Sequence, residues 1–266
     1  MCIFKTLGFY WDRSPVPYNI PENTIERVLF RYHKMLADFV WSAGTLERNP
    51  FTYTEVKTLL DGVTVGGRRI SDQEQILNIA AGSKRLFQLV KQAKFVINKL
   101  TFCELHVLLT RNEAPDGGAF RGEGEEKCLT PYVQISRDNQ YYPHPTVAGA
   151  FALNALFNAG IQIINERIVS PFERAVTFFL FGALQKFFFK GNTRTAFLMM
   201  NGILMSHGID AISISADRAQ EFNENMVQFY QSKDATSMIA FLIDCHPDAA
   251  DIYKQNPGLK KIAATR

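Results

Sequence analysis

The chain has few of the features that mark secreted, metal-binding or membrane proteins. Its 266 residues include 4 cysteines, at positions 2, 103, 128 and 245, and no two of them form a CxxC pair. Scattered cysteines are typical of reduced thiols in a cytosolic protein and argue against a structural zinc site. The N-terminus has no basic segment followed by a long apolar run, so we expect no signal peptide and a cytoplasmic location.

An excess of charge is also missing. The 29 basic and 26 acidic residues leave a net charge of +3, with no basic stripe of the kind that binds nucleic acid. The apolar stretch 147–164 raises the question of a membrane span, but Asn154, Asn158 and Gln162 interrupt it. A buried helix explains this stretch better, so we expect neither a nucleic-acid nor a membrane partner. Nothing in the sequence specifies an oligomeric state.

Helix-start signals are what the chain has in abundance. In a capping box, a small polar residue at the helix start and a Glu or Gln three residues on satisfy free backbone N–H groups. The pattern occurs at Asn23/Glu26, Thr52/Glu55, Ser71/Glu74, Thr101/Glu104, Ser170/Glu173 and Asp217/Gln220. Because apolar residues recur with helical spacing after these signals, the sequence predicts an all-α, mainly helical fold.

The same periodicity divides the chain into segments. It predicts helices over 24–41, 72–98, 102–111, 146–166, 171–189, 193–207, 218–231 and 235–245. Residues 114–145 are rich in Gly and Pro, and residues 132–136 alternate as a strand does, which predicts a short β-hairpin over a helical body. We expect residues 1–50, with their helix, to pack on a domain of residues 51–246. Residues 247–266 then form a frayed or loosely packed tail.

The stretch Lys186-Phe-Phe-Phe-Lys190-Gly191-Asn192-Thr193-Arg194 is the most informative part of the sequence. An apolar helix meets a Gly-Asn break, and a second helix begins with an arginine in its first turn. Free backbone N–H groups at a helix start, next to a fixed positive charge, form a phosphate-binding cup. Asn192 can cap the second helix or bond a phosphate oxygen. The alternative is that Gly-Asn simply joins two helices.

This stretch resembles the motif of Fic-domain proteins, His-Pro-Phe-x-Asp/Glu-Gly-Asn-Gly/Lys-Arg. Leu46-Glu47-Arg48-Asn49 and Gly118-Ala-Phe-Arg121 are similar to two further family segments, and His106 lies where the family often has a histidine. The resemblance covers roughly residues 25–245. It implies a helical bundle with a β-hairpin flap. The family reaction transfers AMP from ATP to a Tyr, Thr or Ser hydroxyl of a target protein.

The resemblance also implies roles for individual residues. The nucleotide, ATP, would contact Lys190, Gly191, Asn192, Thr193 and Arg194. A target protein would pair with the flap, which corresponds to Tyr132, Val133, Gln134 and Ile135. Glu47 looks like the inhibitory glutamate of self-restrained Fic proteins, and our hypothesis is that it pairs with Arg194, Lys186 or Lys190. The alternative for Glu47 is a surface glutamate at a helix end.

Two positions depart from the motif in a way that affects the chemistry. Lys186 stands at the position of the catalytic histidine, and a lysine of ordinary pKa is protonated and is no base. Burial could lower that pKa, but we interpret Lys186 as a phosphate-binding cation, the alternative being a lysine that reaches solvent. Lys190 replaces the metal-binding acid, so we predict no metal site and regard Mg²⁺ as doubtful. Phe197 stands where many members carry a second motif arginine that other members lack, and this difference would weaken the grip on a terminal phosphate.

The sequence therefore predicts a degenerate Fic-like protein that binds ATP and whose AMP transfer is weakened or altered. One alternative is an inactive pseudoenzyme that serves as a protein-interaction module. Another is a phosphotransferase with a different donor. His106, His144 and Cys128 are interpreted as a core histidine, a turn histidine and a loop thiol, and not as catalytic groups.

Overall fold

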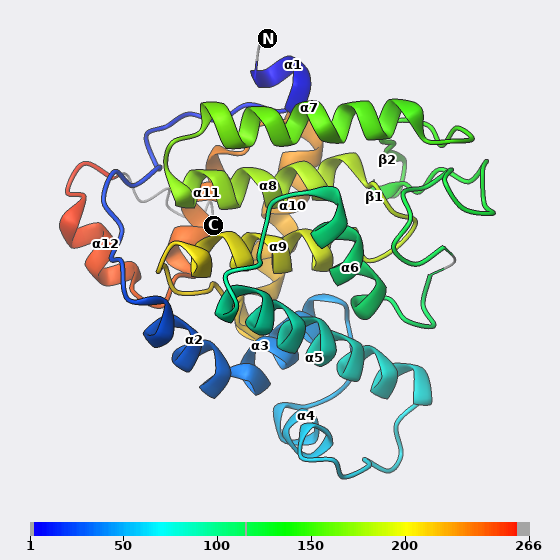
Figure 1. Ribbon diagram of the computed structural model, residues 1–266, viewed down its shortest axis with the longest axis horizontal. Helices are drawn as coiled ribbons and strands as arrows, with labels where there is room; N and C mark the ends of the chain where they lie inside the picture. Colours follow the sequence, from blue (N-terminus) through cyan, green and yellow to red (C-terminus); the bar gives the residue numbers. More distant parts are fainter. Residues whose placement is uncertain (1–2, 115, 260–266) are drawn as a thin grey trace.

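Helix α8 (Pro171–Gln185) lies at the centre of the molecule because almost all of its side chains are buried. It packs between α7 (Phe151–Arg167) and α9 (Asn192–Ser206), and α9 packs in turn on α5 (Ile70–Lys91). These four helices follow one another from top to bottom of Figure 1. The loop that joins α8 to α9 is therefore supported by buried helices on both sides.

The computed structural model describes residues 3–114 and 116–259. The other elements are α1 (Ile3–Leu7), α2 (Ile25–Lys34), α3 (Leu36–Leu46), α4 (Tyr53–Leu60), α6 (Lys99–Leu109), β1 (Val133–Ser136), β2 (Asn139–Tyr141), the 3-10 helix η1 (Ala216–Arg218), α10 (Ala219–Ser232), α11 (Thr236–Asp244) and α12 (Ala249–Gln255). The predicted mainly helical fold with a small β-hairpin is confirmed. None of the described helices combines the length and the apolar run that a membrane crossing requires.

A cluster of phenylalanines forms the part of the core that supports the α8–α9 loop. Phe102 of α6 stacks on Phe157 of α7, with ring centroids 5.6 Å apart, and lies 4.9 Å from Phe188 of the loop. Phe120 and Phe187 stack at 4.9 Å beside them. All five rings are fully buried. Such offset and edge-to-face pairs add to the area that each ring removes from water.

Several helix starts differ from the predicted ones. The caps at Thr52 and Ser170 are confirmed, because each side chain accepts from the N–H of the residue three positions on. Helix α6, by contrast, has Asn98 as its N-cap, and the side chain of Asn98 accepts from the Thr101 N–H at 2.8 Å. Thr101 thus lies inside the helix that it was predicted to cap. The predictions at Asn23, Ser71 and Asp217 are wrong too, and the caps are Thr24, Arg69 and Arg218.

The predicted helix 24–41 is two helices. Met35 (φ −97°, ψ 14°) ends α2 and precedes α3, which continues to Leu46 and carries Glu47 as its C-cap. The predicted helix 171–189 ends at Gln185, because Lys186 is left-handed. The predicted helix 72–98 runs from Ile70 to Lys91.

The end of the chain is better packed than we predicted. Residues 249–255 form α12, whose Ile252 is buried. The buried side chain of Asn256 accepts from the N–H groups of Tyr18 and Asn19 at 3.0 Å and donates to the Asn19 carbonyl. These bonds tie the N-terminal segment to the C-terminal one. Residues 260–266 of the predicted tail lie outside the described residues.

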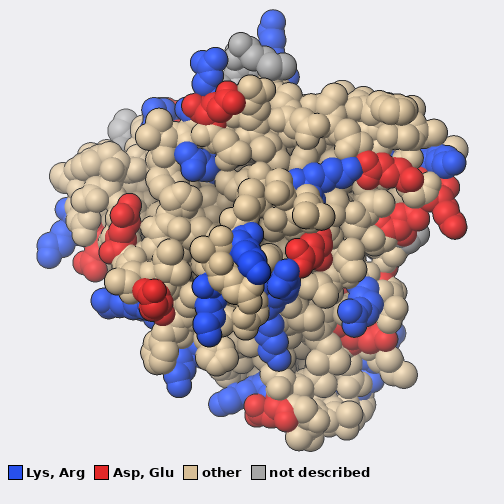
Figure 2. Space-filling view, in the orientation of Figure 1, with Lys and Arg blue, Asp and Glu red and all other residues tan. Residues whose placement is uncertain are grey.

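The charged side chains of the surface are mixed. Figure 2 shows Lys and Arg interspersed with Asp and Glu over one face of the molecule. No long stripe of one sign crosses that face.

Candidate functional site

The loop between α8 and α9 turns twice through left-handed backbone conformations. The first turn is at Lys186 (φ 47°, ψ 65°) and the second at Gly191 (φ 67°, ψ 7°). A Cβ on Gly191 would lie 2.3 Å from Cγ2 of Thr110, so only glycine fits there without displacement. The side chain of Asn192 accepts from the Phe188 N–H at 2.9 Å and donates to the Phe188 carbonyl at 2.7 Å. Asn192 therefore braces the loop from inside with its side chain.

Arg121 holds the end of α8 in place. Its guanidinium donates to the carbonyls of Gln185 and Lys186, and its backbone N–H donates to the carbonyl of Phe187 at 2.9 Å. A further N–H bonds the Thr146 hydroxyl at 2.7 Å. The side chain is fully buried, and burial lowers its pKa to about 10. The partial negative charge of a helix C-terminus favours a cation at this place.

His106 holds the other half of the loop. Its Nδ1 accepts from the Gly118 N–H at 3.0 Å, which requires the proton on Nε2, and Nε2 lies 3.0 Å from the Lys190 carbonyl. Burial lowers the pKa of this imidazole to about 4. His106 is thus a neutral, fixed tautomer that links the turn at Gly118 to the loop. As predicted, it is a core histidine.

The start of α9 offers a cluster of backbone N–H donors. Gly191 is its N-cap and, as a glycine, provides no capping side chain. The first intrahelical bond runs from the Thr195 N–H to the Gly191 carbonyl at 2.9 Å. The N–H groups of Asn192, Thr193 and Arg194 therefore precede the hydrogen-bonded part of the helix. Such groups, together with the helix dipole, attract anions.

Arg194 is enclosed by two carboxylates. Its terminal nitrogens lie 3.1 and 2.6 Å from the two oxygens of Glu113, in a bidentate pair. Its Nε lies 3.2 Å from Glu47, which is an ion-pair distance without the geometry of a hydrogen bond. The Leu109 carbonyl accepts from the same side chain at 3.2 Å. The guanidinium is only 6% exposed, and its two acidic partners raise its pKa against the effect of burial.

Of the three partners considered for Glu47, Arg194 is the one in contact. Burial raises the pKa of Glu47, and the charge of Arg194 opposes this without overcoming it. Burial also acts to raise the pKa of Glu113, but the hydrogen bonds and charge of Arg194 lower it overall. The two carboxylates therefore differ, and Glu113 is the one held firmly in its charged form by Arg194.

Sequence reasoning missed Glu113. It follows α6 in a turn, where its N–H bonds the Thr110 carbonyl at 2.9 Å. Its partner Arg194 is 81 residues away in the sequence. No local pattern connects a glutamate in a polar turn with an arginine on a distant helix. The resemblance to a nucleotide site gave no sign of it either, because such a site would use the arginine for phosphate.

The two lysines of the loop have different surroundings. Lys190 is exposed. Lys186 is half-buried and lies 5.8 Å from the centre of the Tyr230 ring. Burial lowers its pKa to about 8, while the charge of Glu47 acts to raise it. Among the described residues, neither ammonium has a carboxylate at ion-pair distance.

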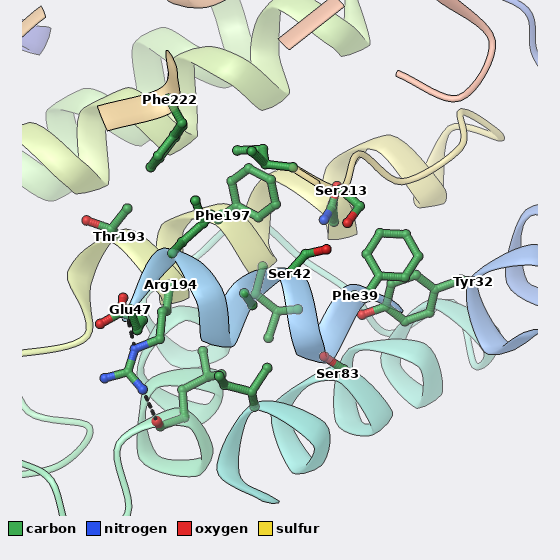
Figure 3. A pocket seen from close by; sticks show the side chains of 17 residues that line it. Tyr32, Phe39, Ser42, Glu47, Ser83, Thr193, Arg194, Phe197, Ser213 and Phe222 are labelled. Atoms are coloured by element: carbon green, nitrogen blue, oxygen red, sulfur yellow. Dashed lines mark hydrogen bonds and ion pairs between the residues drawn. The ribbon is translucent and has the colours of Figure 1, made fainter. Parts of the chain in front are cut away.

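A small, mostly apolar cavity lies beside Arg194, between α3, α5 and α9. Its volume is about 50 Å³. Figure 3 shows Arg194 and Glu47 at one end of it and Tyr32 and Phe39 at the other, with Phe197 and Ser42 between. A cavity of 150 Å³ holds a benzene ring, so this one is too small for a nucleotide base.

The flap is the hairpin β1–β2, in which Val133 pairs with Tyr141 and Gln134 with Gln140. The predicted strand residue Tyr132 lies just before β1 and is exposed. The hairpin is fixed at its base, because Tyr141 stacks on Tyr230 of α10 with ring centroids 5.3 Å apart. Of the predicted flap residues, Gln134 is exposed and Val133 and Ile135 are half-buried.

The donors that a metal ion needs are not assembled in the described part of the chain. No group of three or more His, Cys, Asp or Glu side chains in it could hold a metal ion. Glu47 and Glu113, the two carboxylates at Arg194, are both paired with its guanidinium.

Comparison with known proteins identifies the fold. No protein-family model and no curated protein matches the sequence. A Fic-domain signalling protein from Bacteroides thetaiotaomicron matches with a TM-score of 0.68 and 16% identity, over 98% of this chain and 98% of that one. Fic-1 from C. elegans matches at 0.65 and 18%, over 95% of this chain and 70% of that one. A Fic family protein from Desulfovibrio desulfuricans matches at 0.65 and 15%, over 88% and 75% of the two chains. The chain therefore has the Fic fold.

Proposed function

We propose that this protein binds a nucleotide, ATP in the first instance, at residues 186–194, and that its transfer of AMP to a protein hydroxyl is weakened or lost. The observation that carries the proposal is the start of α9. Its N–H groups follow Lys186 and Lys190 in the same loop, and neither ammonium has a carboxylate at ion-pair distance among the described residues. An anionic phosphate chain complements both kinds of group. The Fic fold supports the same place for a nucleotide.

Weak transfer follows from the side chain at position 186. A general base must be unprotonated near the working pH, and Lys186, with a pKa of about 8, is mostly protonated at pH 7. A phosphate beside it would raise that pKa further. Lys186 therefore suits the binding of phosphate better than the removal of a proton from a target hydroxyl.

The magnesium ion that the Fic fold implies does not fit these residues. The segment 186–194 contains no Asp or Glu, and the ammonium of Lys190 stands at the position of the acid. An ammonium repels a divalent cation, and Mg²⁺ prefers carboxylate and phosphate oxygens. The two lysines would neutralise the phosphates directly. Binding would then be independent of Mg²⁺, and pyrophosphate would leave without a metal to stabilise its charge.

The small volume of the cavity and the paired Arg194 support a local rearrangement on binding. Glu47 ends α3, which forms one wall of the cavity. Release of Glu47 from Arg194 would free one side of the guanidinium. We propose that Glu47 restrains the site in this way, so that Glu47→Ala increases nucleotide affinity. Unchanged affinity in that variant would contradict this part of the proposal.

Calorimetric titration of ATP, with Mg²⁺ and with EDTA, tests the proposal. Lys190→Gln removes an exposed charge at the site and should weaken binding about tenfold, as the loss of one charge-assisted contact does. Lys57→Gln is the matched control, because Lys57 is an exposed lysine on α4, away from the site. We expect equal affinity with Mg²⁺ and with EDTA. Absence of binding under both conditions would overturn the nucleotide proposal.

A second candidate function is a protein-interaction module without chemistry. The observation that favours it is the flap, whose exposed Tyr132 and Tyr142 stand beside a short hairpin. The double variant Lys186→His, Lys190→Asp distinguishes the two. If it transfers AMP to a protein and the natural chain transfers none, the natural chain is a pseudoenzyme. A natural chain that transfers AMP by itself would exclude this candidate.

A further inference from the structure

The guanidinium of Arg194 already binds an anionic side chain of the protein itself. Both terminal nitrogens bond the carboxylate of Glu113, at 3.1 and 2.6 Å, and this pair is largely buried. Carboxylate and phosphate present the same two-oxygen geometry to a guanidinium. Glu113 therefore fills the position in which Arg194 would bind a phosphate in a bidentate way.

The surroundings of Glu113 hold it in this position. The turn that carries it is fixed by Asn78, whose side chain donates to the Arg111 carbonyl at 2.8 Å. Gln75 approaches the carboxylate, with Nε2 3.5 Å from Oε2. Both residues belong to α5, a well-packed helix. The carboxylate is thus placed in advance, and a ligand must displace it or bind without Arg194.

Glu113 makes a stronger contact with Arg194 than Glu47 does. Glu113 has two hydrogen bonds to the guanidinium, whereas Glu47 has one contact at 3.2 Å and no hydrogen bond. Burial acts to raise the pKa of both carboxylates; the hydrogen bonds and charge of Arg194 outweigh it at Glu113, whereas burial outweighs the charge of Arg194 at Glu47. The stronger competitor for Arg194 is therefore outside the α3 segment.

We propose that Glu113 acts as an internal anion that competes with a ligand phosphate for Arg194 and so sets the affinity of the site for phosphate chains. This inference rests on the proposed nucleotide binding at residues 186–194. In the natural chain Lys186 and Lys190 supply the cations that a ligand meets first. Arg194 becomes available only when Glu113 leaves it.

The test is calorimetric titration of inorganic pyrophosphate and of ATP, in EDTA, into the full chain and three variants. Glu113→Gln keeps the shape of the side chain and removes its charge, so we expect binding about tenfold tighter, within the usual range of coupling between sites. Glu47→Gln should give a smaller gain. Glu104→Gln is the control, because Glu104 lies in α6 but pairs with Arg85 and not with Arg194. It should leave affinity unchanged.

Each outcome of these titrations either supports or overturns the proposal about Glu113. A folded Glu113→Gln protein that binds pyrophosphate no better than the natural chain, or more weakly, overturns the proposal and makes Glu113 a positioning residue for Arg194. Binding by Glu113→Gln alone supports it. If neither the natural chain nor any variant binds either probe, the proposed function fails together with this inference.

Glu113→Asp covers the case in which Glu113→Gln does not fold. It keeps the charge on a shorter side chain, which cannot reach both terminal nitrogens of Arg194 from the same backbone position. We expect a partial gain in affinity. Weaker binding by a folded Glu113→Asp protein would count against the proposal.

Discussion

The imidazole of His106 lies flat on the ring of Phe188, with ring centroids 3.7 Å apart and an angle of 9° between the planes. The same imidazole bonds the Gly118 N–H and the Lys190 carbonyl at its two edges. One side chain thus fixes the turn at Gly118 and the loop between α8 and α9, and it does so in a neutral form. A histidine used in this way has no capacity left for acid–base catalysis.

Replacement of His106 should destabilise the protein strongly. His106→Leu removes both hydrogen bonds and leaves the Gly118 N–H and the Lys190 carbonyl without this partner, so we expect a loss of about 2–4 kcal/mol in the free energy of unfolding. Urea denaturation measures it. His33→Leu is the control, because His33 is exposed on α2, and its effect should stay within about 0.5 kcal/mol. A loss below that limit in His106→Leu would contradict the bridging role.

Acid should destabilise the protein through two buried histidines. Burial lowers the pKa of both His106 and His246 to about 4. In the unfolded chain a histidine titrates near pH 6.5, so the unfolded state binds more protons between pH 6.5 and 4. The stability that the two neutral histidines contribute is therefore fully present above pH 6.5. It is lost as pH falls to 4, by up to ~3 kcal/mol for each histidine. Urea denaturation across this range measures the slope, and His246→Gln should roughly halve it.

The affinity for ATP should decline at alkaline pH. In the proposed complex Lys186 would bind phosphate as a cation, and burial lowers its pKa to about 8, so it loses its charge as pH rises through that value. Bound phosphate shifts the decline upward, so we expect it between about pH 8 and pH 10. Titration of ATP at several pH values measures it. The ATP affinity of the Lys186→Arg variant should stay constant over the same pH range, because arginine keeps its charge. A decline in the ATP affinity of that variant would assign the effect to another group.

Gly191→Ala should be costly although it adds only a methyl group. The new Cβ would lie 2.3 Å from Thr110, and φ at this position is +67°. We expect a loss of about 2 kcal/mol or more, from the left-handed backbone and the overlap together. Gly66→Ala is the control, since nothing lies within 4 Å of its Cβ and its φ is not in the left-handed range. Thermal unfolding of both variants would show equal stability only if the turn were free to relax.

Arg194→Ala should destabilise the protein through its partners. Removal of the guanidinium leaves Glu113 and Glu47 partly buried beside each other without a cation, and a broken pair of this kind costs about 3–5 kcal/mol. Addition of Glu113→Gln to Arg194→Ala should restore part of the loss. Failure of the second substitution to restore any stability, in urea denaturation, would mean that the loss arises from packing.

The parts of the fold that the sequence predicted are those with local causes. Helical spacing along one face, and the caps at Thr52 and Ser170, are properties of neighbouring residues. The break at Met35 and the cap at Asn98 were missed, because the same apolar spacing continues across both places. Helix α12 was missed for another reason. It is held by Asn256, whose partners lie at the other end of the chain.

In the candidate site, too, the features with local causes were predicted from the sequence and those that depend on packing were not. Gly191 and Arg194 were identified from the motif, and the left-handed turn at Gly191 follows from its residue type. The bidentate pair between Glu113 and Arg194 could not be predicted, because it depends on how α5, α6 and α9 pack. The role of Asn192 lay between these cases. Its residue type allows a cap, a phosphate contact or a loop brace, and only the packed loop shows that its side chain bonds Phe188.

The hydrogen bonds of Arg121 have a consequence for redesign. They fix the carbonyls of residues 185–187 from a segment outside the loop, and His106 fixes the carbonyl of Lys190 in the same way. The path of the backbone thus depends little on which side chains stand at positions 186 and 190. The side chains at these two positions can therefore be substituted by a different charge, a base or a metal ligand without a change in the path of the turn.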